Sequence, residues 1–216
     1  MSEYRQNEPL SENEISSEPN AEAIQKATPP KASFASSILD TLEMFVFALC
    51  AVILVLTSVF RLCTVSGASM ENTFYAEEKL LISDFFYTPE RGDVIVFHQT
   101  GPDEDDLNEP IVKRVIATEG ETVSISYDEK GKMLILVTDT DGNVTELQED
   151  YAKYEGGNRY APQTVTVPEG HVFVLGDNRN NSSDSRDPNV GFVSEDSILG
   201  NAIFRLLPLS QIGTLD

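Results

Sequence analysis

Two side chains of this sequence could together attack a carbonyl group, those of Ser69 and Lys113. Ser69 lies in the turn Ser66-Gly67-Ala68-Ser69, where small neighbours let a substrate backbone approach closely. Lys113 lies in the middle of a strand-like apolar run, residues 110–116. At an inward position of a half-buried strand a lysine is held out of water, which disfavours its charged form. A neutral amine can take a proton from a hydroxyl, so the pair suggests a Ser/Lys hydrolase.

Taken singly, each residue favours a structural interpretation. A Gly-x-Ser-Met turn is more often an ordinary loop than an active site. Lys113 is followed at once by Arg114, and strand alternation puts the two on opposite faces. Two charges in such a run are typical of an exposed edge strand.

A third polar block, residues 176–186, follows the apolar run 171–175 directly. Its charges alternate in sign, so we expect its carboxylates and guanidinium groups to pair with one another and hold the loop in one shape. The residues concerned are Asp177, Arg179, Asp184 and Arg186. The alternatives are a solvated surface loop and a calcium-binding loop, although the spacing of an EF-hand is absent.

The elements that position these residues follow a membrane anchor. Residues 1–36 contain hardly any large apolar side chain and predict a disordered acidic tail. Residues 44–60 run for 17 positions without a charge, and with their flanks they predict a transmembrane helix over 37–61. A buried core helix and a cleaved signal peptide are the alternatives, but the stretch begins late and is long for a signal peptide. Basic residues in the tail favour a cytoplasmic N-terminus.

Residues 62–216 predict a β-barrel-like extracytoplasmic domain, with a β-rich insertion around 119–168, so the fold class is mainly β with one N-terminal transmembrane helix. Hairpin turns are expected at 129–131 and 141–143. The polar, glycine-rich stretch 151–158 predicts a loop. The predicted strands cover residues 79–83, 93–97, 111–118, 122–127, 133–139, 164–167, 171–175 and 202–206.

The net charge and the few cysteine and histidine residues argue against nucleic-acid binding, a disulfide and a metal site. A formal charge of −21 makes nucleic acid an unsuitable partner. Cys50 and Cys63 are expected to be free thiols, since a continuous helix does not offer disulfide geometry. His98 and His171 have no cysteine or histidine at ligand spacing, so we predict neither a metal site nor a cofactor.

In this order and behind this span, the polar blocks resemble the type I signal peptidase family along most of residues 40–210. Ser69-Met70 with Asn72-Thr73 resembles the family's Ser-Met and Pro-Thr pattern. Residues 91–97, beginning Arg-Gly-Asp, and the Lys-Arg-Val-Ile of 113–116 match two further family blocks. Residues 176–186 match the pattern Gly-Asp-Asn-Arg followed by Ser-x-Asp-Ser-Arg.

The resemblance implies a membrane-bound serine endopeptidase that removes signal peptides from secreted preproteins after small residues. Ser69 would be the nucleophile, Lys113 the general base, and Ser182 would orient the Lys113 amine. Asp184 and Arg186 would brace the loop, with Asp177, Arg179 and Arg114 in support. Gly67 lacks the hydroxyl that some members use to assist the oxyanion, which leaves this task to the Ser69 N–H. Asn72 stands where proline is commoner and puts the stiffness of that turn in question.

The resemblance also implies partners and location: preproteins and the lipid bilayer, a monomer, and a single-pass cell-membrane protein. Two other functions remain open. Self-cleaving phage repressors also use a Ser/Lys pair, but they need a DNA-binding region that the acidic tail and span replace. A membrane-anchored β-domain that scaffolds exported proteins without turnover is the non-enzymatic alternative.

Overall fold

The computed structural model describes residues 34–98, 110–155, 157 and 159–215. The chain divides into two compact units, residues 1–47 and 48–216. Most of the predicted disordered tail, residues 1–33, lies outside the described residues. Residues 34–36, which were also predicted as tail, form the start of the first helix.

The apolar stretch forms one helix, α1 (Phe34–Val59). Its residues 37–59 are long and apolar enough to cross a membrane, and none of them is buried by other parts of the protein. The predicted end at residue 61 is two residues too late. Phe60 and Arg61 instead begin a strand, where they pair with Ser83 and Ile82. Sheet hydrogen bonds to β2 replace the helical ones from Phe60 onward, although the two residues at this junction, Val59 and Phe60, are both apolar.

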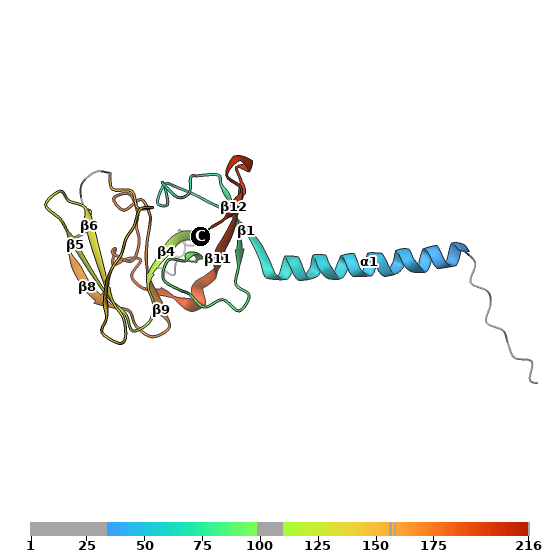
Figure 1. Ribbon diagram of the computed structural model, residues 1–216, viewed down its shortest axis with the longest axis horizontal. Helices are drawn as coiled ribbons and strands as arrows, with labels where there is room; N and C mark the ends of the chain where they lie inside the picture. Colours follow the sequence, from blue (N-terminus) through green and yellow to red (C-terminus); the bar gives the residue numbers. More distant parts are fainter. Residues whose placement is uncertain (1–33, 99–109, 156, 158, 216) are drawn as a thin grey trace, which may run out of the picture. The chain divides into compact units, whose positions relative to one another are not determined.

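The larger sheet has eight strands and is built from antiparallel pairs (Figure 1). Its order is β1 (Phe60–Thr64), β2 (Lys79–Ser83), β11 (Ile198–Leu207), β3 (Val94–Phe97), β4 (Ile111–Ala117), β9 (His171–Leu175) and β10 (Val193–Ser194), with β12 (Gly213–Thr214) paired to β11. Two short 3₁₀-helices accompany it, η1 (Glu195–Ser197) and η2 (Leu209–Gln211).

A second sheet is formed by the chain between β4 and β9. Its order is β7 (Val144–Glu146), β6 (Met133–Thr138), β5 (Thr122–Tyr127) and β8 (Gln163–Thr166). Figure 1 shows β5, β6 and β8 together, apart from β1, β11 and β12. The predicted turns at 129–131 and 141–143 join its antiparallel strands as expected. Val123, Ile125 and Ile135 pack with Phe173 and Leu175 of β9, which fixes this sheet against the larger one.

All the predicted strands are present, whereas β1, β7, β10 and β12 were not predicted.

β4, the strand that carries Lys113 and Arg114, is an interior strand of the larger sheet. It lies between β3 and β9, so the edge-strand interpretation of its two charges is wrong. Lys113 is 3% exposed and Arg114 8% exposed. Two cations buried in an interior strand need specific partners, because burial without them costs several kcal/mol.

Candidate active site

The turn that carries Ser69 is held by buried neighbours on its C-terminal side. Met70 and Phe74 are buried in the core beside Val94 and Val112. The Phe74 N–H donates to the Met70 carbonyl at 2.8 Å. Ser69 itself stays partly exposed. Its hydroxyl therefore lies at the surface, on a turn whose following residues are anchored in the core.

Lys113 reaches this hydroxyl from the middle of β4. Its Nζ donates to Ser69 Oγ at 2.8 Å, across 44 residues of sequence, and to the Val112 carbonyl at 3.1 Å. The structure therefore brings together the two residues from which the sequence argument began. A hydroxyl and an amine at this distance can exchange a proton directly.

The amine of Lys113 is poised to be neutral near physiological pH. Burial lowers the pKa of Lys113 to about 8, because the ammonium is removed from water. The carboxylates of Asp184 and Asp177 raise this pKa, and the guanidinium of Arg186 lowers it. Desolvation is the largest of these effects, so the Lys113 ammonium loses its proton more readily than that of an exposed lysine.

The polar loop 176–186 is rigid, but its charges do not all pair within it. Asp184 and Arg186 do pair, through two hydrogen bonds of 2.7 Å, and Asp184 also accepts from the Gly176 N–H. Asp177 and Arg179 instead find partners outside the loop, which corrects the expectation that all four pair with one another. Because these partners come from distant elements, the loop is fixed to the rest of the site.

Asp177 links three segments of the site. Its carboxylate accepts from Arg114 Nε at 3.0 Å and Nη2 at 2.7 Å. It also accepts from the Thr73 hydroxyl at 2.6 Å. Through Asp177, Arg114 connects β4 to the loop and to the turn after Ser69, from the face of β4 opposite Lys113.

Ser182 lies beside the Ser69 turn without the predicted bond to Lys113. It is 2% exposed, and its hydroxyl has no hydrogen-bond partner among the described residues. A Cβ on Gly176 would lie 2.2 Å from Ser182 Oγ and 2.5 Å from the Ser69 carbonyl oxygen. Only glycine at position 176 lets these segments approach so closely. The predicted hydrogen bond between Ser182 and Lys113 is not formed in this structure.

Asn178, a residue of the loop, is hydrogen-bonded to backbone carbonyl groups of the turn that carries Ser69. Its side-chain amide donates to the Ala68 carbonyl and its N–H to the Ser69 carbonyl, both at 3.0 Å. On the other side of Ser69, Gly67 has φ +76°, with open space where a Cβ would lie.

Three residues that the sequence did not single out complete the site, and all come from the segment between β7 and β8. Glu149 forms the ion pair with Arg179, and the Tyr151 ring lies 4.0 Å from the guanidinium carbon of Arg114. The Lys153 N–H donates to the Asp177 carbonyl at 2.8 Å. No motif marks this polar stretch, so only the structure could identify it.

The described residues contain no group of three or more His, Cys, Asp and Glu side chains that could hold a metal ion. The hydrogen bond between Lys113 and Ser69 offers a chemistry of its own: nucleophilic attack by the hydroxyl with proton transfer to the amine.

Comparisons with known proteins identify the family of the chain. The family model described as signal peptidase, peptidase S26, matches residues 38–207. A signal peptidase I from Leptolyngbya laminosa is 33% identical over 195 residues, covering 88% of each chain. A probable signal peptidase I-2 from Synechocystis is 31% identical over 195 residues, covering 88% of this chain and 81% of its own.

Among solved structures, a signal peptidase I from Enterococcus faecalis is 32% identical and has a TM-score of 0.39. The match covers 53% of this chain and 97% of that one. The family model, by contrast, matches the chain across the α1 span, the Ser69 turn, β4 and the polar loop. The chain therefore belongs to the signal peptidase family, peptidase S26, whose members are serine peptidases that cleave signal peptides.

Proposed function

We propose that this protein is a membrane-anchored signal peptidase that uses Ser69 as nucleophile and Lys113 as general base. The observation that carries the proposal is the 2.8 Å hydrogen bond between Lys113 Nζ and Ser69 Oγ, made by a lysine whose pKa is lowered to about 8. The substrates are secreted preproteins, cleaved after small residues in an Ala-x-Ala-like context.

The reaction proceeds through an acyl-enzyme. Neutral Lys113 takes the Ser69 proton while Ser69 Oγ bonds to the scissile carbonyl carbon, which gives a tetrahedral oxyanion. The resulting ammonium donates a proton to the leaving amine as the peptide bond breaks. A water molecule, deprotonated by Lys113, then hydrolyses the ester and returns Ser69 to its starting state.

The oxyanion is stabilised by the Ser69 N–H, which donates to no acceptor in the part of the chain that the structure describes. Ser182 orients the Lys113 amine during turnover. This role is supported by the burial of Ser182 and by its unpaired hydroxyl, since a buried hydroxyl without a partner is costly. Asp184 with Arg186, and Asp177 with Arg114, hold the loop and the strand that carry these groups.

The anchor is α1, with the N-terminus cytoplasmic and the β-domain outside the cell membrane, and the protein acts as a monomer. The apolar character of residues 37–59 supports the span. A scaffold that binds exported proteins without cleaving them is the alternative. The lowered pKa of Lys113 disfavours the scaffold, because burying a lysine so that it loses its proton more easily does not help a surface to bind a partner.

An assay on the purified full-length protein in detergent tests this proposal. A preprotein with an Ala-x-Ala site is expected to be cut once, after the last small residue, as mass spectrometry of the products would show. The Ser69→Ala variant is expected to be inactive while still binding the preprotein. Normal processing by Ser69→Ala would contradict the assignment, and binding without cleavage by the unaltered protein would favour the scaffold.

The pH dependence of turnover follows from the pKa of Lys113. The base must be neutral, so kcat/KM should rise with pH through about 8 and level off above it. The measurement is a pH–rate profile on a short soluble peptide that contains the cleavage site. An optimum on the acid side of neutrality would exclude a lysine base.

Asn72→Pro is expected to lower kcat/KM, although proline is the commoner residue in the family pattern. Asn72 has φ +91°, and its side-chain amide donates to the Tyr151 carbonyl at 2.8 Å. Proline fixes φ near −65°, so Asn72→Pro must rearrange the turn after Ser69. Strain of about 1 to 3 kcal/mol corresponds to a roughly 5- to 150-fold loss in kcat/KM.

The matched control for this substitution is Asn72→Gly, which tolerates positive φ and removes only the bond to Tyr151. It should lose no more than about tenfold. A Pro variant as active as the unaltered protein would show that the left-handed turn is dispensable.

A further inference from the structure

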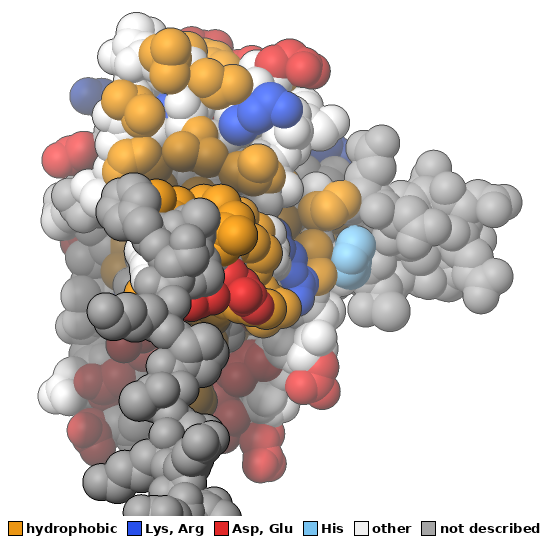
Figure 2. All heavy atoms as spheres, turned by 90° about the vertical axis from the view of Figure 1, so that its right-hand side faces the viewer, with side chains coloured by type: hydrophobic (Ala, Val, Ile, Leu, Met, Phe, Trp, Pro, Cys, Tyr) orange, Lys and Arg blue, Asp and Glu red, His pale blue; other side chains and the backbone are white. Residues whose placement is uncertain are grey.

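Buried guanidinium groups distinguish the site from the surface of this acidic chain. Figure 2 shows acidic side chains mainly below and at the edges of the face that it views. Three arginine side chains of the site are buried instead, those of Arg114, Arg179 and Arg186. A buried cation has given up its hydration, so it is tolerated only where its contacts are well oriented. The groups that orient these arginines are therefore candidates for a role in positioning the site.

The guanidinium group of Arg114 is fixed at its edge by hydrogen bonds and on its face by an aromatic ring. Its Nε and Nη2 donate to Asp177, and its Nη1 donates to the Gly92 carbonyl at 2.8 Å. The Tyr151 ring covers the face, with its centre 4.0 Å from the guanidinium carbon. An arginine over an aromatic ring is attracted to it, the more so where water is excluded. Tyr151 therefore keeps Arg114 in the orientation in which it reaches Asp177.

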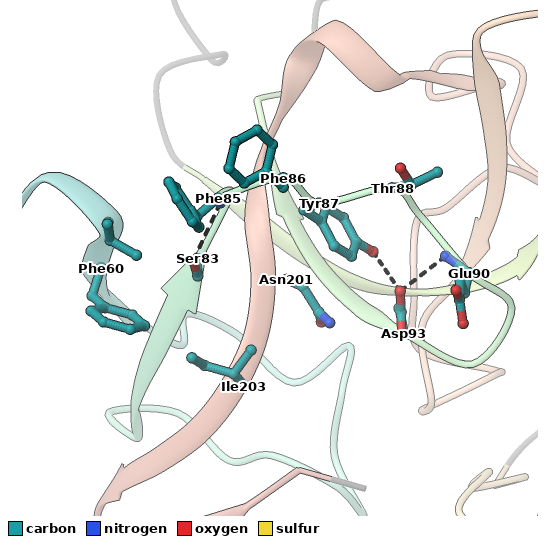
Figure 3. Close-up of a pocket in the computed structure, with 11 residues that line it drawn as sticks. Phe60, Ser83, Phe85, Phe86, Tyr87, Thr88, Glu90, Asp93, Asn201 and Ile203 are labelled. Carbon is teal, nitrogen blue, oxygen red and sulfur yellow. Dashed lines mark hydrogen bonds between the residues drawn. The ribbon is translucent and has the colours of Figure 1, made fainter.

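The turn that offers the Gly92 carbonyl is rigid in its own right. Figure 3 shows the Tyr87 hydroxyl and the Glu90 backbone directed at Asp93. The Asp93 carboxylate accepts from the Tyr87 hydroxyl at 2.7 Å and from the Glu90 N–H at 2.9 Å. Because the Gly92 carbonyl belongs to the backbone, replacement of a side chain can test the contact on the face, that of Tyr151.

Tyr151 reaches the turn after the proposed nucleophile by two routes. Directly, its carbonyl accepts from the Asn72 side-chain amide at 2.8 Å. Indirectly, its ring orients Arg114, and Asp177 accepts from Arg114 at 2.7 Å and from the Thr73 hydroxyl at 2.6 Å. The two routes end at neighbouring residues, so Tyr151 affects where this turn lies with respect to β4.

The backbone next to Tyr151 is bonded to the polar loop. The Lys153 N–H donates to the Asp177 carbonyl at 2.8 Å, and the Lys153 carbonyl accepts from the Arg179 N–H at 3.0 Å. The Lys153 ammonium also forms an ion pair of 3.3 Å with Glu71. The segment around Tyr151 thus joins the loop to the turn, and its ring is held in place independently of Arg114.

We propose that Tyr151 is a positioning residue, which keeps the hydroxyl of Ser69 within reach of Lys113. It acts through Arg114 and Asn72, and the inference rests on the Ser/Lys chemistry proposed above. The two reacting atoms lie 2.8 Å apart, and a misplacement of about 1 Å lowers a rate by about 10²-fold. Loss of the ring should therefore slow the chemical step and leave the binding of peptide unchanged.

The test compares kcat and KM of full-length variants in detergent, on a peptide that contains the cleavage site, at a temperature well below the Tm of each variant. Tyr151→Leu removes the ring and keeps the carbonyl. We expect its kcat to fall at least about tenfold, with KM within about twofold of the unaltered protein. Tyr151→Phe keeps the ring and loses the hydroxyl bond to Glu149, so its kcat should stay within about threefold.

The matched control is Tyr154→Leu. Tyr154 lies in the same segment and also donates to Glu149, at 3.2 Å, but its ring packs against the buried cluster of the second sheet. Its replacement should lower Tm and leave kcat within about twofold. A Tyr151→Leu protein that loses Tm in the same way but keeps its kcat would overturn the proposal, since Tyr151 would then serve the fold alone.

Thr73→Val tests the indirect route, because it removes the hydroxyl that donates to Asp177. Alone it should lower kcat by about tenfold with KM unchanged. Combined with Tyr151→Leu, it should lower kcat by less than the product of the two single effects, since both act through Asp177. Effects that multiply would overturn the path through Arg114, and with it the proposal.

Two further outcomes are decisive. If Tyr151→Leu does not fold, Thr73→Val decides the matter, and an unchanged kcat for that variant would overturn the proposal. An unaltered protein that does not cleave the peptide would overturn the Ser/Lys chemistry and this inference together. Cleavage at equal kcat by the unaltered protein and by Tyr151→Leu would overturn the positioning role and leave the Ser/Lys chemistry intact.

Discussion

Replacing Lys113 by methionine is expected to abolish turnover and, at pH 7, to make the folded protein more stable. The loss of activity follows from removal of the base that faces Ser69 Oγ at 2.8 Å. General-base catalysis contributes about 10² to 10⁴ in rate, and no other described side chain is hydrogen-bonded to Ser69 Oγ. We therefore expect kcat/KM to fall by about 10³-fold or more.

The gain in stability follows from the lowered pKa. Lys113 has a pKa of about 8 when folded and an ordinary value of 10.5 when unfolded. Below pH 8 both states are protonated, and the folded state must bury an ammonium group. At about 1.4 kcal/mol per pKa unit, this costs on the order of 3 kcal/mol. Methionine keeps the length and apolar stem of the side chain and removes the charge, although the two hydrogen bonds of the amine are lost.

The sign of the effect gives a specific signature. Between pH 8 and 10.5 the unfolded state binds more protons than the folded state, so the stability of the unaltered protein rises with pH in this window. The advantage of Lys113→Met should therefore shrink from pH 7 to pH 10, as thermal unfolding in detergent would show. Lys132→Met, at an exposed position between β5 and β6, controls for the loss of a surface charge. A Lys113→Met protein less stable than the unaltered one at pH 7 would mean that the amine is not held out of water.

The sequence was sufficient to propose the Ser69 and Lys113 pair, because both lie in patterns that physical chemistry can interpret. A serine between small residues is accessible, and a lysine amid β-branched residues is buried. Whether β4 lay inside the sheet or at its edge could not be decided in this way. That depends on the pairing of β4 with both β3 and β9, which joins Arg114 to Val94, 20 positions away, and to Leu175, 61 positions away.

The partners of the loop charges were less predictable than the loop itself. Alternating signs over residues 176–186 are equally compatible with pairing inside the loop and with pairing to distant residues. Asp184 and Arg186 pair with each other inside the loop, whereas Asp177 and Arg179 pair with residues outside it. β1 was missed for a similar reason. It follows the helix directly, and no turn residue separates Val59 from Phe60, so no local signal marks where the helix ends and the strand begins.

Glu149, which has no sequence signal, is expected to be among the most important residues for the fold. It pairs with Arg179, whose side chain is fully buried, and Glu149 itself is 5% exposed. Burial alone would lower the pKa of Arg179, but the hydrogen bonds and charge of Glu149 outweigh this and raise it, so the guanidinium stays charged. Glu149→Ala leaves that buried charge without its carboxylate counter-charge, which costs about 3 to 5 kcal/mol.

The measurement for Glu149→Ala is thermal unfolding in detergent, where this cost corresponds to a fall in Tm of about 6 to 20 °C for a chain of this size. The control is Glu155→Ala, which removes a carboxylate that is 74% exposed in its pair with Lys153 and should change Tm by no more than a few degrees. A Glu149→Ala protein as stable as the control would show that Arg179 is compensated by other groups.

A double replacement, Glu149→Met with Arg179→Met, separates stability from positioning. Apolar side chains of similar length often replace a buried ion pair without loss, so most of the stability should return. Activity should not, because Arg179 also donates to the Gly176 carbonyl at 3.0 Å, and Gly176 is the point of closest approach between Ser182 and the Ser69 turn. A double variant that is both stable and fully active would show that Arg179 contributes to the stability of the fold and not to the positioning of the site. A stable but slow variant, with its KM for peptide unchanged, would place it in the support of the site.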